Sequence, residues 1–373
     1  MTLMSAAKDK PAPDSLRAIG IDREHGGAAD HVAIDFSASI NPLGPPPAAV
    51  AEYHRAVESL TRYPDPFPVT LAREISRWMG VRDEQVLVGN GSTQLIHLLA
   101  RAMNWRRPVV VTPTFSEIAN ALILNARSAK MAGDSAPLAI QLSPDRGFEL
   151  RIEDVAHAME NGADAIFIGR PNSPTGSMLS FDAATAIALE GARFNAHCVF
   201  DEAFIDFAAD ARSMVHLIDR APNVVVLRSL TKIFAIPGLR LGFAVSEART
   251  NTRLREMIEP WSVNAVAERV GLACLDGAAE FNAQTRDLIA VEREYLSRGL
   301  GQNPNLRVFP SAANFLMIAA RESGAEKFGA FMLRKGIAVR DLRSLPGAGP
   351  GLYRVGIRNH DDNRRLVAAA RKF

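Results

Sequence analysis

The sequence has few cysteines, no long apolar run and no excess of charge of one sign. Its 373 residues include two cysteines, Cys198 and Cys274, and no C-x-x-C pair. Two thiols in a chain of this length form no disulfide framework, so we expect both to be reduced, as is usual in the cytoplasm. No stretch approaches the roughly 18 apolar residues of a membrane span. Residues 1–15 lack the apolar core of a signal peptide, so we expect a cytoplasmic protein without a membrane partner.

The near balance of charges argues against a nucleic-acid partner. Lys and Arg number 43 against 41 for Asp and Glu, a net charge of +2, and no basic block stands out. A protein of this composition lacks the positive surface that attracts a phosphate backbone. What the chain does have is apolar residues, 47% of the total, which suffice for a sizeable packed core.

Strand and helix patterns alternate between about residues 85 and 245. Apolar runs such as VLVG, VVVT, AIFIG and VVVL end in polar turns, and several precede longer segments with helical periodicity. Continuously apolar strands are typical of a parallel sheet that helices cover on both faces. The sequence therefore predicts an α/β fold with a large domain over 61–250.

A smaller α+β domain is predicted from the rest of the chain. Residues 251–373 combine long helical patterns, over 248–276 and 279–300, with short strand-like pieces. Residues 1–60 are predicted to form an N-terminal arm and part of this small domain. In open α/β sheets, ligands bind at the carboxyl ends of the strands, so the turns there are the places to look for chemistry.

The first such turn carries a lysine. Lys232 follows an apolar strand, with Ser229 three residues before it and Arg240 eight residues after it. The residues around Lys232 are almost wholly apolar, and loss of hydration lowers the pKa of a lysine and makes its amine nucleophilic. A surface lysine in a loop is the alternative; a dehydrated one suits Schiff-base chemistry.

Three further turns add polar groups at strand ends. GNGSTQLI places Ser92 and Thr93 at a helix start, where free N–H groups and hydroxyls can bind phosphate. It is neither a dinucleotide fingerprint, because Gln94 replaces the third glycine, nor a P-loop. GRPNSPTG forms a proline-rich turn, and Asp201 ends another strand, where a buried carboxylate needs a cation.

Together these groups match the needs of pyridoxal 5'-phosphate: a lysine, an anion for the pyridine nitrogen, and donors for the phosphate. The chain resembles the fold type I (aspartate-aminotransferase-like) pyridoxal-phosphate enzymes along nearly its whole length. The motifs are SLTKIFAIPGLRLGF, DEAFIDF and PNSPTG. Within that class, HGG at 25–27, DFSASINPLGPP at 35–46, YPDP at 63–66 and GNGSTQLI at 89–96 resemble the threonine-phosphate decarboxylases.

The resemblance implies a role for each matching residue. Lys232 forms the Schiff base with the cofactor and later moves protons, Asp201 pairs with the pyridine nitrogen, and Phe115 stacks on the ring. Tyr63 reaches the cofactor phosphate of a neighbouring subunit, which implies a homodimer. The other residues expected to bind the cofactor are Gly91, Ser92, Thr93, Asn172, Ser173, Ser229 and Arg240.

The substrate implied is a small phosphorylated amino acid. Arg354 is expected to bind its carboxylate, and Arg340 and His25 its phosphate, with Arg343 and Arg358 as alternative arginines. The reaction implied is decarboxylation of L-threonine O-3-phosphate to (R)-1-amino-2-propanol O-2-phosphate, a step of cobalamin biosynthesis. We expect no metal site, because a pair of histidines without a third ligand is weak evidence for one.

Two departures from the family pattern bear on the chemistry. Ser173 stands where relatives usually have the asparagine that contacts the ring hydroxyl, and Asn172 precedes it, so either residue could make that contact. Phe204 stands where aminotransferases usually have a tyrosine that donates to the same oxygen. The alternatives are an aminotransferase, acting on histidinol phosphate, and a non-catalytic regulator that binds the cofactor. The regulator would need a DNA-binding module, for which the first 60 residues offer no pattern.

Overall fold

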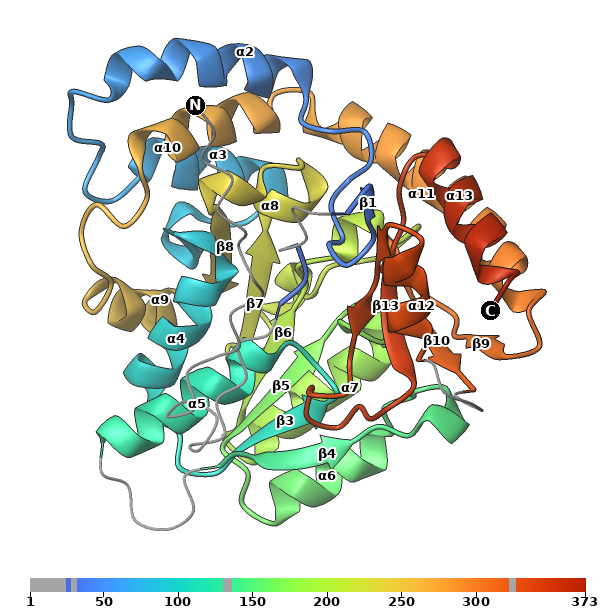
Figure 1. The fold of residues 1–373 in the computed structure, drawn as a ribbon. Coiled ribbons are helices and arrows are strands. Elements are labelled where there is room, and N and C mark those ends of the chain that lie inside the picture. The colour runs from blue at the N-terminus through green and yellow to red at the C-terminus, as the bar shows by residue number, and fades with distance from the viewer. Residues whose placement is uncertain (1–24, 28–31, 130–135, 322–326) are drawn as a thin grey trace.

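The computed structural model describes residues 25–27, 32–129, 136–321 and 327–373. At its centre is a seven-stranded sheet with the order β2-β8-β7-β6-β5-β3-β4 (Figure 1). β8 runs antiparallel to β2 and β7, and the remaining pairs are parallel. This confirms the predicted α/β fold with a mostly parallel sheet. The strands are β2 (Val86–Gly89), β3 (Pro108–Thr112), β4 (Leu138–Gln141), β5 (Ala165–Gly169), β6 (His197–Asp201), β7 (Val224–Ser229) and β8 (Gly242–Ser246).

Helices cover both faces of this sheet. Successive strand residues point to opposite sides, and both sets of side chains are apolar and need to be buried. Val199 packs into the apolar layer under α4 (Gly91–Met103), α5 (Ser116–Ser128) and α9 (Ala248–Arg255). The next residue, Phe200, belongs to the layer on the other face. That layer includes α3 (Val69–Met79), α6 (Ile152–Glu160), α7 (Phe181–Arg193) and α10 (Ala265–Leu275). Burial on both sides explains why the strands are continuously apolar.

A four-stranded antiparallel sheet, in the order β12-β13-β10-β9, forms the core of the smaller unit. Its strands are β9 (Leu306–Val308), β10 (Phe315–Ala320), β12 (Arg340–Asp341) and β13 (Leu352–Gly356). The same unit contains three helices, at the right of Figure 1: the long α11 (Ala278–Gly301), α12 (Phe328–Arg334) and α13 (His360–Ala370). β1 (Ile34–Asp35) pairs in parallel with β11 (Ile337–Ala338), so the N-terminal segment joins this unit. The domain boundaries at 60 and 250 stay predictions.

The single helix expected over 248–276 is wrong. α9 ends at Arg255 and α10 begins at Ala265, and Pro260 lies between them. Proline lacks the N–H that a helix interior needs. Asn264 then starts α10, because its side chain accepts a hydrogen bond from the N–H of Ala267 (2.8 Å).

The remaining elements of the described residues are two helices and several short 3-10 turns. α2 (Pro47–Ala56) packs on α10, and the short α8 (Leu230–Ile233) follows β7 directly. Short 3-10 turns are η1 (Val57–Ser59), η2 (Asp83–Gln85), η3 (Pro144–Arg146), η4 (Ile205–Phe207), η5 (Met214–Leu217) and η6 (Pro237–Leu239). Cys198 and Cys274 are both buried free thiols. Within the described ranges, no helix has the length and apolar character needed to cross a membrane.

Candidate active site

A cavity of about 810 Å³ lies at the carboxyl ends of the large-sheet strands, with the small unit forming part of its wall. The predicted site residues that line it are His25, Gly91, Ser92, Thr93, Phe115, Ser173, Asp201, Ser229, Lys232, Arg240, Arg340 and Arg354. These residues are as far apart in sequence as His25 and Arg354. The large sheet brings the residues at its strand ends to one edge, and β12 and β13 of the small sheet add Arg340 and Arg354 from the other side.

Lys232 lies in α8, the short helix that follows β7. Burial, followed by the charges of Arg354 and Arg240, lowers the pKa of Lys232 to about 8, while the charge of Asp201 opposes them. At neutral to mildly alkaline pH, a substantial share of its amine is therefore uncharged. An uncharged amine is the form that attacks a carbonyl.

Asp201 is the last residue of β6, and its Oδ1 accepts a hydrogen bond from the N–H of Ala203 (3.0 Å). Burial raises the pKa of Asp201 to about 6, against the lowering effects of that hydrogen bond and of the Lys232 charge. A carboxylate with a raised pKa gains stability from a cationic partner. The protonated nitrogen of a pyridine ring is such a partner.

The N-terminus of α4 forms a phosphate-binding corner. Gly91 opens the helix with φ of +79°, and a Cβ at this position would lie 2.8 Å from Nη2 of Arg240. Glycine therefore lets the guanidinium approach the helix N-terminus, where Ser92 and Thr93 also line the cavity. The helix N-terminus and the arginine both favour an anion at this corner.

Ser229 and Thr231 complete the same corner from the β7 side. Their hydroxyl oxygens lie 2.8 Å apart, and both residues line the cavity. Thr231 was not among the residues predicted from the sequence. The available signal was its hydroxyl directly before Lys232, on the same tight turn as Ser229.

The structure separates the two candidates for the ring-hydroxyl contact. Asn172, predicted to bind the cofactor, does not line the cavity: its Nδ2 donates to the carbonyl of Pro113 (2.8 Å) and to Oγ1 of Thr175 (2.9 Å). Asn172 therefore holds the turn together through its Nδ2, and its contact with the cofactor stays a prediction. Ser173 lines the cavity instead and accepts a hydrogen bond from Nη1 of Arg354 (3.1 Å).

Arg354 and Arg340 are cross-strand neighbours on the cavity wall. Nη2 of Arg354 donates to the carbonyl of Ser37 (2.9 Å). Burial, followed by the charge of Arg340, lowers the pKa of Arg354 to about 10. Two like charges directly opposite each other on antiparallel strands are unfavourable unless an anion lies between them. The pair therefore favours an anionic ligand.

The alternative arginines are engaged elsewhere. Arg343 forms an ion pair with Asp341, and Nε of Arg343 lies 2.7 Å from Oδ2 of that residue. Nε of Arg358 donates to Asp362 (2.8 Å). Neither arginine lines the cavity. The structure thus places Arg340 and Arg354, and not their neighbours, at the candidate site.

Tyr63 lies outside the cavity of its own chain. Its side chain is 88% exposed, and its ring centroid lies 5.6 Å from that of Trp261. Contact with the cofactor of a neighbouring subunit stays a prediction. His31, the second histidine of the N-terminal pair, lies outside the described residues, and in the described part of the chain no cluster of His, Cys, Asp and Glu could hold a metal ion.

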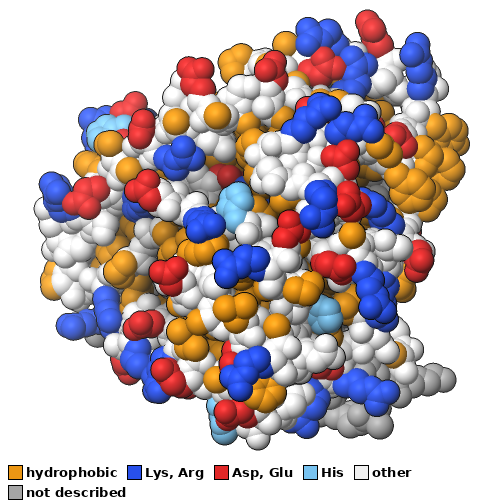
Figure 2. Space-filling model, turned by 180° about the vertical axis from the view of Figure 1, so that it is seen from behind, with side chains coloured by type: hydrophobic (Ala, Val, Ile, Leu, Met, Phe, Trp, Pro, Cys, Tyr) orange, Lys and Arg blue, Asp and Glu red, His pale blue; other side chains and the backbone are white. Residues whose placement is uncertain are grey.

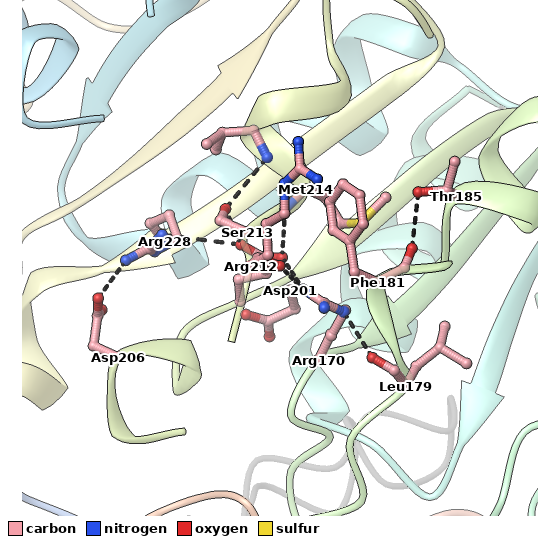
Figure 3. A network of polar contacts seen from close by, with 12 residues as sticks. Arg170, Leu179, Phe181, Thr185, Asp201, Asp206, Arg212, Ser213, Met214 and Arg228 are labelled. Atoms are coloured by element: carbon pink, nitrogen blue, oxygen red, sulfur yellow. Dashed lines mark hydrogen bonds and ion pairs between the residues drawn. The ribbon is translucent and has the colours of Figure 1, made fainter. Parts of the chain in front are cut away.

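Glu202, next to Asp201, has a structural role that the sequence did not reveal. It is fully buried, and Figure 3 labels its partners Arg170, Ser213, Met214 and Arg228. Oε1 of Glu202 accepts from Nη1 of Arg170 (2.8 Å) and from the N–H of Met214 (2.9 Å). Oε2 accepts from the hydroxyl of Ser213 and lies 3.9 Å from Nη1 of Arg228. Arg228 in turn pairs with Asp206 at 2.6 Å.

The network holds two cations and two anions, so the buried charges compensate one another. Glu202 anchors the turn that follows Asp201 to β7 as well, because its N–H donates to the carbonyl of Leu227 (2.9 Å). Figure 3 shows Asp201 beside this network, with Arg170 and Arg228 approaching from either side. The contacts therefore fix the strand end that carries Asp201.

These residues fit pyridoxal 5'-phosphate. The cavity offers a dehydrated lysine, a buried carboxylate that favours a cation, an anion-binding helix N-terminus with an arginine, and Phe115 on the wall. The fold and the site together define a fold type I enzyme that uses this cofactor. The chain belongs to the family Aminotransferase class I and II, which it matches over residues 32–370.

The chain is similar to curated enzymes of two kinds and to solved structures. The chain is 33% identical to threonine-phosphate decarboxylase from Salmonella typhimurium over 346 residues, which cover 92% of both chains. It is 31% identical to histidinol-phosphate aminotransferase from Symbiobacterium thermophilum over 360 residues, covering 96% of this chain and 93% of the relative. The structure of histidinol-phosphate aminotransferase from Sinorhizobium meliloti in complex with pyridoxal-5'-phosphate matches with a TM-score of 0.79. That match has 20% identity and covers 98% of this chain and 95% of the other.

Proposed function

We propose that the protein decarboxylates L-threonine O-3-phosphate to (R)-1-amino-2-propanol O-2-phosphate, as a step of cobalamin biosynthesis. The observation that carries this proposal is the pair of neighbouring arginines, Arg340 and Arg354, on the wall of the cavity that also holds Lys232. Threonine phosphate has two anionic ends, a carboxylate and a phosphate. Two arginines that lie opposite each other suit a ligand with two such groups.

Arg354 is the proposed carboxylate-binding residue. Ser173 and the carbonyl of Ser37 hold its guanidinium through hydrogen bonds of 3.1 and 2.9 Å, so its direction is set before substrate arrives. Binding both anionic ends fixes the rotation about the bond between the amine and Cα. That rotation decides which bond at Cα breaks.

The bound cofactor supplies the electron sink. Asp201 would hold the positive charge on the cofactor's pyridine nitrogen, and Lys232 would hold the cofactor and move protons. As the Cα–carboxylate bond breaks, CO₂ leaves and Cα takes up a proton in its place. The pKa of Lys232, about 8, suits an amine that both accepts and returns protons near neutral pH.

Phe204 favours decarboxylation over transamination. It lines the cavity three residues after Asp201, where aminotransferases usually carry a tyrosine. Phenylalanine has no hydroxyl to donate to the ring oxygen, so that oxygen is freer to hold the proton shared with the lysine nitrogen. The second candidate is an aminotransferase that acts on histidinol phosphate, and the identity of 31% to such an enzyme favours it. The residue at position 204 is the difference that favours the decarboxylase over this candidate.

One assay separates the two candidates. The purified holoenzyme is incubated with L-threonine O-3-phosphate without any oxo acid, and the released CO₂ is measured. The expected result is continuous release over many turnovers. Activity only with histidinol phosphate and 2-oxoglutarate would refute the decarboxylase and support the aminotransferase.

We also propose that two copies of the chain form a homodimer. Apolar side chains gather at the edge beyond the C-terminal end of α2, visible at the right of Figure 2. The exposed large apolar residues between 57 and 69, together with the neighbour of Tyr63, are Val57, Leu60, Tyr63, Phe67, Val69 and Trp261. A second copy would cover them and bring Tyr63 to its cofactor phosphate. Size-exclusion chromatography with light scattering measures the molar mass of the eluting protein and tests this proposal. A monomer at micromolar concentration would contradict it. A cytoplasmic location remains a prediction.

A further inference from the structure

A carboxylate between two histidines lies on the cavity wall, away from the residues assigned to the cofactor. Glu117, in the first turn of α5, has a side chain only 8% exposed. Its Oε1 lies 3.3 Å from Nε2 of His25, and its Oε2 lies 3.1 Å from Nε2 of His97. Asn120 donates to Oε1 from Nδ2 at 2.9 Å. All three members of this His25–Glu117–His97 cluster line the cavity.

The cluster brings together three distant segments. His25 precedes the two glycines of the N-terminal HGG segment, His97 lies in the second turn of α4, and Glu117 follows Phe115 by two residues. The ring of His25 lies 5.6 Å from that of Phe115, centroid to centroid. A hydrogen bond also holds the HGG segment in place, because the N–H of Gly27 donates to the hydroxyl of Ser37 (2.8 Å). Glu117 therefore fixes His25 beside the proposed ring-stacking residue.

The charges of the cluster are unequal. Burial would raise the pKa of Glu117, but hydrogen bonds from His25, His97 and Asn120 outweigh it and hold the pKa well below its usual range. Glu117 is therefore ionised, and an ionised carboxylate only accepts hydrogen bonds. Both imidazoles must then donate from Nε2. A protonated imidazole retains a second N–H, at Nδ1, that can donate to another anion.

A negative carboxylate on this wall would by itself repel a phosphate. The other carboxylate among the described wall residues, Asp201, is assigned to the pyridine nitrogen. The two imidazole rings cover the carboxylate of Glu117, since Nε2 of His25 lies 3.3 Å from Oε1 and Nε2 of His97 lies 3.1 Å from Oε2. Arg340 and Arg354 line the same cavity. This part of the wall then suits the dianionic end of a phosphorylated amine.

We propose that Glu117 is a positioning residue that holds His25 and His97 as one pair for binding the substrate's phosphate, with His97 as an additional phosphate ligand. The inference rests on the proposed function only in that the substrate carries a phosphate. It assigns Glu117 no contact with the substrate. The carboxylate acts through the two rings, by orienting them.

The test measures phosphate recognition without decarboxylation. O-Phosphoethanolamine and ethanolamine both carry the reacting amine and lack a carboxylate, and they differ only in the phosphate. Their dissociation constants for the holoenzyme are measured by spectral titration and by calorimetry. In Glu117→Gln, the amide cannot accept from both rings and carries no charge. We expect binding of O-phosphoethanolamine to weaken about tenfold or more, since a charge-assisted hydrogen bond contributes that much, with ethanolamine unchanged.

A matched control is Glu190→Gln. Glu190 pairs with Arg193 on α7 at 2.7 Å, away from the cavity, and the same substitution there should leave both dissociation constants unchanged. Thermal unfolding of the holoenzyme checks that Glu117→Gln folds. If it does not, His97→Asn tests the same pair without removing the buried carboxylate.

A double-mutant cycle separates positioning from a merely structural role. Glu117→Gln should cost little phosphate affinity in a His25→Asn/His97→Asn background, because the rings through which it acts are gone. An equal loss in both backgrounds, or an equal loss for ethanolamine, would overturn the proposal. Failure of the wild-type holoenzyme to release CO₂ from threonine phosphate would refute the proposed reaction and leave these binding results intact.

Discussion

The rings of Phe204 and Phe315 meet edge to face, with centroids 5.0 Å apart and planes at 88°. Phe204 follows β6 of the large sheet, and Phe315 begins β10 of the small one. The guanidinium carbon of Arg354 lies 5.3 Å from the centre of the Phe315 ring. The residue that replaces the aminotransferase tyrosine is therefore packed against the aromatic ring that supports the proposed carboxylate-binding arginine.

Restoring the missing hydroxyl tests the importance of Phe204. In Phe204→Tyr, a phenol that donates to the cofactor's ring oxygen stabilises the deprotonated form of the lysine-linked cofactor. The pKa of the lysine-linked cofactor should therefore fall by about one unit or more, because a hydrogen bond to a charged oxygen is strong. Titration of the visible absorption band measures this value. Phe207→Tyr, a buried phenylalanine outside the cavity, is the control; an unchanged titration in Phe204→Tyr would refute the argument.

Removal of the lysine tests the assignment of Lys232. Lys232→Ala should bind the cofactor without the visible band of the lysine linkage, and borohydride should then fix no cofactor to the protein. CO₂ release should fall by several orders of magnitude. Lys335→Ala, at an exposed lysine next to Phe331, should behave as wild type. A borohydride-stable linkage in Lys232→Ala would show that another lysine is used.

The ionised carboxylate of Asp201 should destabilise the fold of the cofactor-free protein. Because burial raises its pKa to about 6, ionisation is less favourable in the folded than in the unfolded state. The folded state therefore loses stability as pH rises through that value. At about pH 9, where Lys232 is mostly uncharged, Asp201→Asn should raise the free energy of unfolding by about 1 kcal/mol. Urea denaturation measures it, and the gain should vanish at about pH 3, where the aspartate is protonated in both the folded and the unfolded state; an equal gain at both pH values would contradict the assignment.

The buried network around Glu202 should be sensitive to loss of one charge. Glu202→Gln leaves Arg170, which is 1% exposed, without its anion. Breaking such a pair costs about 3 kcal/mol or more. Denaturant unfolding measures the loss, and Glu190→Gln at an exposed ion pair should cost under about 1 kcal/mol. A loss for Glu202→Gln no larger than this control would mean that the network does not anchor the strand end.

Local patterns predicted most of the large sheet. Continuously apolar runs identify β3, β5, β6 and β7 because both of their faces are covered. β4 lacks such a run: it lies at the sheet edge with Leu138 exposed. The broken helix around Pro260 shows the opposite case, in which periodicity on either side concealed a local stop signal.

The sequence by itself determined the chemistry at the strand ends. Lys232, Asp201 and the helix start at Gly91 stand in recognisable short motifs, because a cofactor needs fixed atoms at fixed points of a parallel sheet. Only the tertiary structure decided between neighbours. It placed Ser173 rather than Asn172 on the cavity wall, placed Arg340 and Arg354 there instead of Arg343 and Arg358, and joined His25, His97 and Glu117. Such choices depend on side-chain directions and contacts between distant segments, which packing fixes and linear spacing does not encode.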